Sequence, residues 1–391
     1  MLPATRWAEE DLEGLEAKSL LRTLNEREAL EGPQGRQVRV NQNLLINFSS
    51  NDYLGLANDE HVKRAWQEGA QHYGVGSGAA RLVSGDSVAH CALEQKLAHF
   101  KKAEAVLLFN SGYAANVGIL SSLCGPGDVI FSDALNHASL IDGCRLSRAQ
   151  VVVYPHLDVE ALNTLIPLHP GRRRLVCSDA VFSMEGDCAP LKELVQVCQG
   201  HNAALLVDEA HATGVFGPGG EGLCEAAGVA DKVDVRMGTL GKALGVFGAF
   251  AAASQSIIDL LVNRARPFVY STSLPAAACV AAIASLNQMI SRPDLRERLW
   301  ENIRFFAAGL NQLGLPAGAH SAILPVVLGT PARALSAAAA LREGGIWVKA
   351  IRPPTVPEGR SLLRFAISAA HQKSDLESCL QVLERTGLKN G

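Results

Sequence analysis

Short apolar runs rich in β-branched residues alternate with longer segments of helical spacing through the middle of the chain, and no other feature restricts the fold as much. The apolar runs lie at residues 106–109, 151–154, 175–177 and 204–207, and the helical segments at 88–100, 114–123, 159–165 and 191–199. Buried strands that alternate with helices are typical of βαβ units and of a mainly parallel sheet. The sequence therefore predicts an α/β protein.

Changes of pattern along the chain predict three segments. Residues 1–45 are expected to form an N-terminal arm, because leucines and charges at helical spacing are followed by the breaker Gly32-Pro33-Gln34-Gly35. Residues 46–289 contain the alternating strands and helices and form the predicted large domain. Residues 290–391 begin at the break Ser291-Arg292-Pro293, and their mixture of helices with strands at 323–328 and 347–351 predicts a smaller C-terminal α+β domain.

Composition excludes several classes of function. The net charge of −3 gives no basic surface for nucleic acid. The longest apolar run, residues 243–253, contains two glycines and is too short to cross a bilayer, and residues 1–18 lack the pattern of a signal peptide. None of the nine cysteines forms a C-x-x-C pair, so no metal site is expected and the thiols are expected to be reduced, as in a cytoplasmic protein.

A carboxylate follows the predicted strand at 204–207, in the sequence Asp208-Glu-Ala-His211. In open α/β sheets, ligands bind beyond the carboxyl ends of the strands. Asp208 could simply cap the next turn. A helicase-type ATPase box is excluded, because that box needs an upstream G-x-x-x-x-G-K-[ST] loop, and Gly241-Lys242 comes later and is followed by Ala243. The other functional interpretation is an aspartate that keeps the ring nitrogen of pyridoxal phosphate (PLP) protonated.

A single lysine, Lys242, stands among small uncharged residues at 237–245. It could be a surface lysine whose stem lies along apolar neighbours. The functional interpretation is a lysine that forms an imine with PLP, because the imine removes the cost of burying an ammonium group. Thr239, three residues earlier, offers a hydroxyl group to a phosphate.

Three weaker motifs are consistent with the same cofactor. The turn at 110–116 contains Gly112 and Tyr113 after a predicted strand and before a helix, where backbone N–H groups can hold a phosphate. His137 could lie over an aromatic ring, and Ser183 could bind a ring oxygen. Each motif also has an ordinary interpretation as a turn or as a core histidine. Taken with Asp208 and Lys242, however, the order along the chain is a phosphate turn, a stacking histidine, a ring aspartate and an imine lysine, which is the order expected for one PLP site.

A set of motifs spread over residues 20–371 resembles the α-oxoamine synthases, which are PLP-dependent enzymes of fold type I. The motifs are Asn47-Phe-Ser-Ser-Asn51-Asp-Tyr-Leu-Gly-Leu56, Gly76-Ser-Gly78, His137-Ala-Ser-Leu140, Val207-Asp-Glu-Ala-His211, Thr239-Leu-Gly-Lys242 and Tyr270-Ser-Thr-Ser273. One departure is Gly78-Ala79-Ala80-Arg81, where relatives often have Gly-Ser after the glycine. The resemblance implies an aspartate aminotransferase-like fold with a mainly parallel central sheet.

The resemblance also implies a role for each matched residue. Lys242 is expected to form the imine, Asp208 to pair with the pyridinium nitrogen and His137 to stack on the ring, and these three are the expected catalytic residues. Further cofactor contacts are expected at Gly112, Tyr113, Ser183, His211 and Thr239, with Thr272 reaching the cofactor phosphate of a partner subunit. Substrate contacts are expected at Arg22, Asn51, His137, Thr355 and Arg364.

The implied reaction is an acyl transfer in which an amino acid condenses with an acyl thioester and CO2 is released. The segment Ala350-Ile-Arg-Pro-Pro-Thr355-Val-Pro357 resembles the biotin-pathway members most. The expected substrates are therefore L-alanine and a pimeloyl group carried on coenzyme A (CoA) or acyl carrier protein, and the expected assembly is a cytoplasmic homodimer. A glycine C-acetyltransferase reaction is the alternative. A PLP-binding regulator without turnover would need a nucleic-acid or partner-binding module, and the chain shows no basic helical extension.

Overall fold

The computed structural model describes residues 2–22, 30–31, 35–40 and 42–388. The chain divides into two compact units, one formed by Met1–Ser50 with Leu299–Gly391 and the other by Asn51–Arg298. The sequence-based segments 1–45, 46–289 and 290–391 stay a prediction. The structure groups the first fifty residues with the C-terminal part of the chain.

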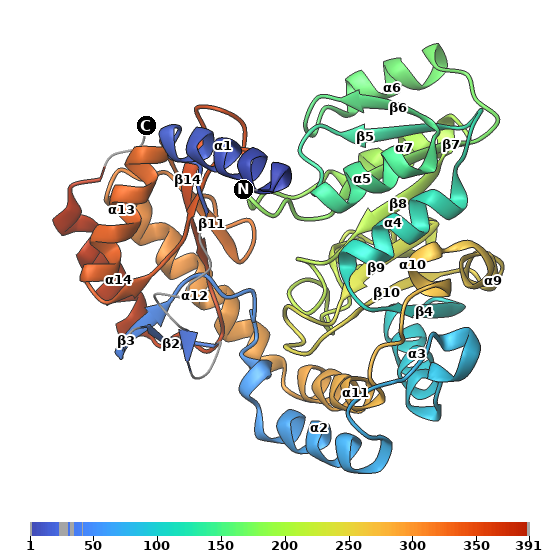
Figure 1. The fold of residues 1–391 in the computed structure, drawn as a ribbon, viewed down its shortest axis with the longest axis horizontal. Helices are drawn as coiled ribbons and strands as arrows, with labels where there is room; N and C mark the ends of the chain where they lie inside the picture. The colour runs from blue at the N-terminus through green and yellow to red at the C-terminus, as the bar shows by residue number, and fades with distance from the viewer. Residues whose placement is uncertain (1, 23–29, 32–34, 41, 389–391) are drawn as a thin grey trace. The chain divides into compact units, whose positions relative to one another are not determined.

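The unit Asn51–Arg298, all of which is described, contains a seven-stranded sheet (Figure 1). Its strand order is β4-β10-β9-β8-β7-β5-β6. The strands are β4 (Ala105–Phe109), β5 (Val129–Asp133), β6 (Gln150–Tyr154), β7 (Arg174–Asp179), β8 (Ala204–Asp208), β9 (Val235–Thr239) and β10 (Ala249–Ala253). Only β10 runs antiparallel to its neighbours. The predicted α/β class with a mainly parallel sheet is confirmed.

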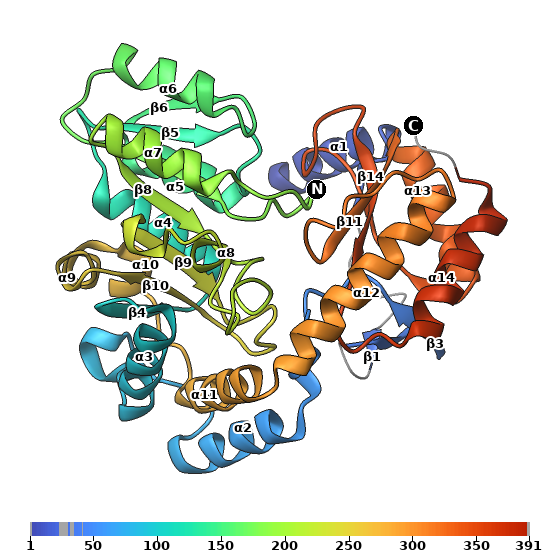
Figure 2. The same ribbon diagram turned by 180° about the vertical axis from the view of Figure 1, so that it is seen from behind.

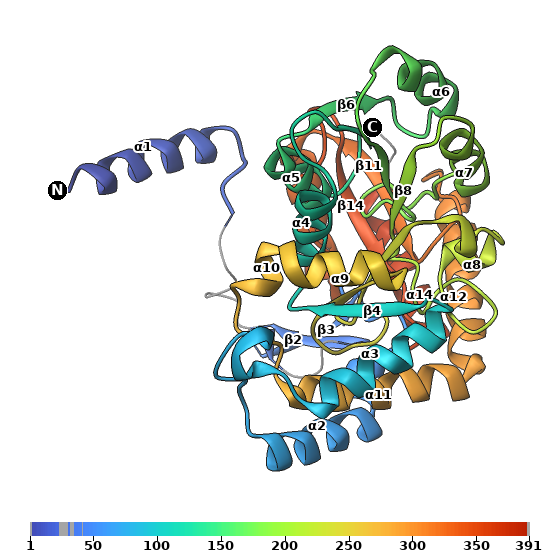
Figure 3. The same ribbon diagram turned by 90° about the vertical axis from the view of Figure 1, so that its right-hand side faces the viewer.

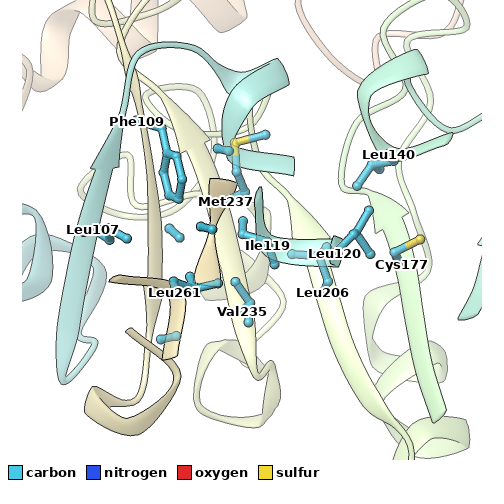
Figure 4. Packing of buried hydrophobic residues seen from close by; sticks show 14 of the residues in the cluster. Leu107, Phe109, Ile119, Leu120, Leu140, Cys177, Leu206, Val235, Met237 and Leu261 are labelled. Carbon is cyan, nitrogen blue, oxygen red and sulfur yellow. The ribbon is translucent and has the colours of Figure 1, made fainter. Parts of the chain in front are cut away.

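Helices cover both faces of this sheet (Figures 1 and 2). On one face lie α4 (Gly112–Leu123), α5 (Ala138–Ser147), α9 (Gln255–Arg264) and α10 (Arg266–Val269), and on the other α6 (Val159–Leu168) and α7 (Leu191–Gly200). Alternate residues of the strands, such as Leu107 with Phe109 and Val235 with Met237, point into one apolar core with Ile119 of α4 (Figure 4). This alternation follows from the two-residue period of a strand.

Three further helices build outward from the edge strand β4. The helix α3 (Val88–Lys101) lies against β4, α11 (Ala276–Ser291) lies beside α3, and α2 (Glu60–Tyr73) packs on α11 (Figure 3). Gly69 of α2 makes the last contact close, because a Cβ there would lie 2.9 Å from the Cα of Ala277. Short elements complete the unit: η2 (Leu56–Asn58), η3 (Arg81–Gly85), α8 (Leu223–Ala226) and η4 (Ala230–Lys232).

The second unit contains two small sheets. Strands β1 (Leu30–Glu31), β2 (Gln37–Val40), β3 (Asn43–Asn47) and β12 (Ile346–Trp347) form one sheet, and β11 (Ile323–Gly329), β14 (Ser361–Ala366) and β13 (Ala350–Ile351) form the other. Its helices are α1 (Pro3–Ala17), α12 (Pro293–Gln312, which begins in the other unit), α13 (Pro331–Glu343) and α14 (Lys373–Thr386). This unit combines helices with strands, as expected of the smaller α+β region, and the predicted bounds 290–391 stay a prediction. No helix in the described ranges is long and apolar enough to span a bilayer.

One local expectation differs from the structure. The single strand expected at 347–351 is divided between β12 and β13, which belong to different sheets. The helical spacing at the N-terminus produces α1, which starts at Pro3, a residue whose fixed φ suits the first turn of a helix. The helix ends before Ser19, whose φ is 56°. Residues 23–29, where the helical spacing continues, lie outside the described residues.

Candidate active site

Three neighbouring parallel strands end in buried aspartates, which places carboxylates along one edge of the sheet. Asp133 ends β5, Asp179 ends β7 and Asp208 ends β8, and each is at most 3% exposed. In the register of the sheet Asp179 lies directly beside Asp208. Burial and the neighbouring Asp208 carboxylate raise the pKa of Asp179 well above its usual value. This edge is where an open α/β sheet binds its ligands.

Asp208 is held by neutral donors. Its Oδ2 accepts a hydrogen bond from Asn116 Nδ2 at 2.7 Å, and its Oδ1 accepts one from the backbone N–H of Ala210 at 2.8 Å. In the part of the chain that the structure describes, no lysine, arginine or histidine forms an ion pair with this carboxylate. Burying a carboxylate without a cationic partner is costly. Asp208 therefore suits a cationic ligand group such as a protonated ring nitrogen.

Lys242 follows the adjacent strand β9, and its turn is fixed by tight packing. The N–H of Gly245 donates to the carbonyl of Lys242 at 2.8 Å. Gly245 has φ 63°, and a side chain there would clash with the backbone of Ala57. The half-buried Lys242 side chain ends with Nζ 2.7 Å from Nε2 of His211. This contact with a buried imidazole favours the functional interpretation of Lys242 over a surface lysine.

His211 joins Lys242 to a residue that the sequence interpretation missed. His211 is 6% exposed, and its Nδ1 lies 2.6 Å from the hydroxyl of Tyr53. Tyr53 is fully buried, and its hydroxyl donates to Oδ1 of Asn51 at 3.2 Å. The predicted residues Lys242, His211 and Asn51 therefore lie in one series of contacts that passes through Tyr53. Tyr53 belongs to the Asn47–Leu56 motif, which was the only sequence signal that could have drawn attention to it.

His137 caps the start of α5. Its Nδ1 accepts a hydrogen bond from the backbone N–H of Ser139 at 3.2 Å, and its own N–H donates to Asp179 Oδ2 at 2.7 Å. Desolvation lowers the pKa of His137, the Asp208 carboxylate raises it and Lys242 lowers it, with a net downward shift. The ring is therefore neutral near pH 7. Because Nδ1 accepts from a backbone donor, the ring hydrogen of this neutral form lies on Nε2.

The expected phosphate-binding turn forms the start of α4. Ser111 caps the helix by accepting the N–H of Ala114 at 3.1 Å, and Gly112 and Tyr113 are its first two residues. The exposed side chain of Tyr113 hydrogen-bonds to Asp142, and this contact raises the pKa of the phenol. The turn thus presents backbone N–H groups of a twelve-residue helix, which suits an anion.

Thr239 and Thr272 were expected to bind phosphate through their hydroxyl groups. The Thr239 hydroxyl donates to the carbonyl of Gly248 at 3.0 Å and accepts the N–H of Gly241 at 3.1 Å, so it also closes the turn before Lys242. Thr272 is exposed, and its carbonyl accepts from Asn110 Nδ2 at 2.7 Å. This bond fixes the backbone of Thr272 beside the turn that precedes α4.

Ser183 lies in the loop between β7 and α7, and a charged cluster anchors that loop. Within the loop, the backbone N–H of Phe182 donates to the carbonyl of Asp187 at 3.0 Å. His156 lies between two carboxylates, with Nδ1 2.8 Å from Asp133 and Nε2 3.0 Å from Asp187. Burial alone would lower the pKa of His156, but the hydrogen bonds to both carboxylates raise it to about 9. The imidazolium therefore ties the Ser183 loop to the end of β5.

This cluster predicts a pH-dependent stability. The pKa of His156 is about 9 in the folded protein and about 6.5 in an unfolded chain. Because the folded value is the higher one, the contribution is fully present below pH 6.5 and is lost as the pH rises through 9. We expect the wild type to be more stable than His156→Gln by a few kcal/mol at pH 6, and the difference to shrink by pH 10. Urea unfolding of both proteins at pH 6, 8 and 10 measures this difference in the free energy of unfolding. A difference that does not change with pH would contradict the raised pKa of His156.

The other expected substrate residues lie in the unit that contains both ends of the chain. The exposed guanidinium of Arg22 donates to Thr355 Oγ1 at 3.3 Å and to the carbonyl of Pro353 at 3.1 Å. The structure thus brings Arg22 and Thr355 together. Arg364 lies in β14 and is 8% exposed.

Comparison with protein families and curated proteins gives consistent matches. Residues 44–383 match the model described as aminotransferase class I and II. The chain is 54% identical over 381 residues to the 8-amino-7-oxononanoate synthase of Anaeromyxobacter dehalogenans, covering 97% of this chain and 95% of that protein. It is 46% identical over 392 residues to the 8-amino-7-oxononanoate synthase of Geobacter sulfurreducens, covering 99% of each.

Solved structures resemble the whole chain. The serine palmitoyltransferase of Sphingomonas wittichii has a TM-score of 0.92 at 34% identity, covering 99% of this chain and 98% of that one. A serine palmitoyltransferase solved with PLP has a TM-score of 0.93 at 31% identity, with the same coverage. The 8-amino-7-oxononanoate synthase of Francisella tularensis has a TM-score of 0.76 at 29% identity, covering 88% and 97%.

Proposed function

The chain belongs to the aminotransferase class I and II family and, within it, to the α-oxoamine synthases, and from this membership we propose the reaction that it catalyses. It condenses L-alanine with a pimeloyl thioester to give 8-amino-7-oxononanoate, CO2 and the free thiol carrier. One observation carries the proposal. At the carboxyl ends of the neighbouring strands β8 and β9, the buried carboxylate of Asp208 has no cationic partner among the described residues, and Lys242 follows β9. Near-full-length relatives at 45–54% identity support the same reaction.

PLP is the cofactor of this family, and the donor set fits it. Lys242 would hold its aldehyde carbon, Asp208 its ring nitrogen and His137 one face of its ring. The other contacts would be the N–H groups of Gly112 and Tyr113 and the hydroxyl of Thr239 at the phosphate, and Ser183 and His211 at the phenolic oxygen. When bound, PLP supplies a ring that withdraws the electrons released at the amino acid α-carbon. Asp208 would sustain this property by keeping the ring nitrogen protonated.

Lys242 and His137 would carry out the proton transfers. The Nζ of Lys242 would remove the α-proton of alanine, which leaves the α-carbon able to attack the thioester carbonyl. The new C–C bond forms as the C–S bond breaks, and the thiol leaves with the electron pair. His137, neutral with its hydrogen on Nε2, would donate to the keto oxygen while the carboxylate of alanine leaves as CO2. Lys242 would then return a proton to the α-carbon.

The substrate contacts are proposals that rest on the family membership and on the charge and hydrogen-bonding groups of these side chains. Arg364 would bind the carboxylate of alanine through its guanidinium fork, and Asn51 would bind near the reacting centre beside Tyr53. Arg22 and Thr355, which contact one another, would bind the pimeloyl chain.

We further propose a cytoplasmic homodimer in which Thr272 of each subunit reaches the cofactor phosphate of the other. Thr272 is exposed beside residue 110, which is consistent with a residue that faces a partner. All nine cysteines are free thiols, as expected in a reducing compartment.

Substrate competition tests the proposed reaction against the alternative of a glycine C-acetyltransferase. Purified protein loaded with PLP is given alanine with pimeloyl-CoA, glycine with acetyl-CoA, or serine with either thioester, and the release of free thiol is measured. We expect kcat/KM to be at least about 10-fold higher for alanine with pimeloyl-CoA, since one methyl group supports discrimination of that size. A higher value for glycine with acetyl-CoA would reassign the enzyme to the alternative.

A further inference from the structure

The hydroxyl group of Tyr53 lies between two residues of the proposed site. It is 2.6 Å from Nδ1 of His211, and it donates its single hydrogen to Oδ1 of Asn51 at 3.2 Å. On the far side of the imidazole, Nε2 is 2.7 Å from Nζ of Lys242. Tyr53 is fully buried and His211 is 6% exposed, so protein contacts largely fix the hydrogen positions.

The direction of these hydrogen bonds fixes the form of the imidazole. A side-chain amide oxygen can only accept, so the Tyr53 hydrogen points to Asn51 and an oxygen lone pair faces His211. Nδ1 of His211 must then carry a hydrogen in order to bond to that lone pair. In the neutral ring this leaves Nε2 without a hydrogen, and Nε2 is the atom that faces the lysine amine.

We propose that Tyr53 is a positioning residue that holds His211 in the Nδ1–H form and thereby makes His211 Nε2 the acceptor of the Lys242 ammonium proton. The N–H bond of Lys242 breaks and a new one forms at Nε2, so that Lys242 keeps an electron pair for bond formation. The resulting imidazolium donates from Nδ1 to Tyr53. When PLP is bound, this Nε2–H would be available to its phenolic oxygen. This inference rests on the proposed function for its consequence in catalysis, but the hydrogen positions do not depend on that function.

Nuclear magnetic resonance of the cofactor-free full-length protein, labelled with 15N-histidine, tests the hydrogen positions. The His211 signals are assigned by their absence from His211→Gln. We expect a protonated Nδ1 and a bare or exchanging Nε2 in the wild type and in Asn51→Asp, which retains an acceptor for the Tyr53 hydrogen. Asn51→Leu removes that acceptor, so we expect the Tyr53 hydrogen to turn to Nδ1 and the ring hydrogen to move to Nε2. A wild-type His211 with a bare Nδ1 and a protonated Nε2 would overturn the proposal, even in an active enzyme.

Tyr53→Phe tests the consequence for catalysis. We expect kcat to fall about 10- to 100-fold with little change in KM for alanine, because proton acceptance from Lys242 is weakened. The acidic limb of the kcat/KM profile should move to higher pH. Tyr154→Phe, which removes the hydroxyl of another buried tyrosine in the same unit, serves as the matched control and should keep the wild-type profile. A Tyr53→Phe enzyme with wild-type kcat and pH profile would refute the positioning role, whereas a wild type without thiol release would refute only the proposed function.

Discussion

Replacing Lys242 with alanine is expected to lower kcat by about 10⁴-fold or more, the largest effect of any single change in this protein. The variant loses both the amine that would hold PLP and the base that would remove the α-proton, and the second loss alone costs roughly 10²–10⁴-fold. Thiol release from pimeloyl-CoA with saturating alanine measures the rate. Borohydride reduction and peptide mapping of the wild type should place the pyridoxyl group on Lys242.

Lys232→Ala is the matched control for this prediction. Lys232 is an exposed lysine of the same unit, in the short helix η4. Its replacement removes the same functional group and should leave the rate and the cofactor content unchanged. A Lys242→Ala enzyme that retains wild-type kcat, or a pyridoxyl group mapped to a different lysine, would contradict the assignment of Lys242.

Lys101→Met is expected to destabilise the protein by about 3–5 kcal/mol, the largest effect on folding, because it leaves a buried carboxylate without its cation. Lys101 and Glu209 are both buried, with Nζ 2.6 Å from Glu209 Oε2. The same ammonium group also donates to Thr213 Oγ1 at 3.3 Å and to the carbonyl of Glu221. Denaturant unfolding of the wild type and the variant at pH 7 measures the difference.

The neighbouring residue supplies a matched control for this second prediction. Lys102 pairs with Glu225, but its side chain is 63% exposed, so Lys102→Met should leave the unfolding midpoint close to the wild-type value. The double variant Lys101→Met/Glu209→Gln should recover part of the lost stability, because the remaining buried group is then neutral. Equal effects of Lys101→Met and Lys102→Met would show that the buried pair has no special role.

The Lys101–Glu209 pair also bears on the site, because Glu209 follows Asp208 directly. The carbonyl of Glu209 accepts the N–H groups of Ala212 and Thr213, and its Oε1 accepts the N–H of Cys224 at 2.8 Å. These contacts fix the turn that carries His211. The buried Lys101–Glu209 pair thus helps to fix the position of the turn that follows β8.

Much of the fold could be predicted from the sequence because its signals are local. Each central strand is a short apolar run, and each crossover helix has apolar residues at helical spacing. Elements such as β8 (Ala204–Asp208) and α7 (Leu191–Gly200) can therefore be predicted from windows of about ten residues. The position of Asp208 at a strand end follows from the same pattern. Ligands of open α/β sheets bind beyond the carboxyl ends of the strands, and this rule then places Asp208 at the ligand site.

The remaining features depend on contacts between distant parts of the chain. The pairing of β3 with β12 joins residues about three hundred positions apart, and no local pattern encodes it. The division of 347–351 between two sheets has the same origin. Tyr53 meets His211 across 158 positions, and Lys101 meets Glu209 across 108, so neither partner could be identified from periodicity or composition.

The fate of the alanine carboxyl carbon tests the proposed reaction most directly. The PLP-loaded enzyme is given pimeloyl-CoA and L-alanine labelled with 13C in its carboxyl group, and the released thiol, the labelled CO2 and the organic product are quantified together. Decarboxylative condensation predicts one labelled CO2 for each thiol and a product, 8-amino-7-oxononanoate, that contains no label. Thiol release without labelled CO2, or a product that retains the label, would contradict it.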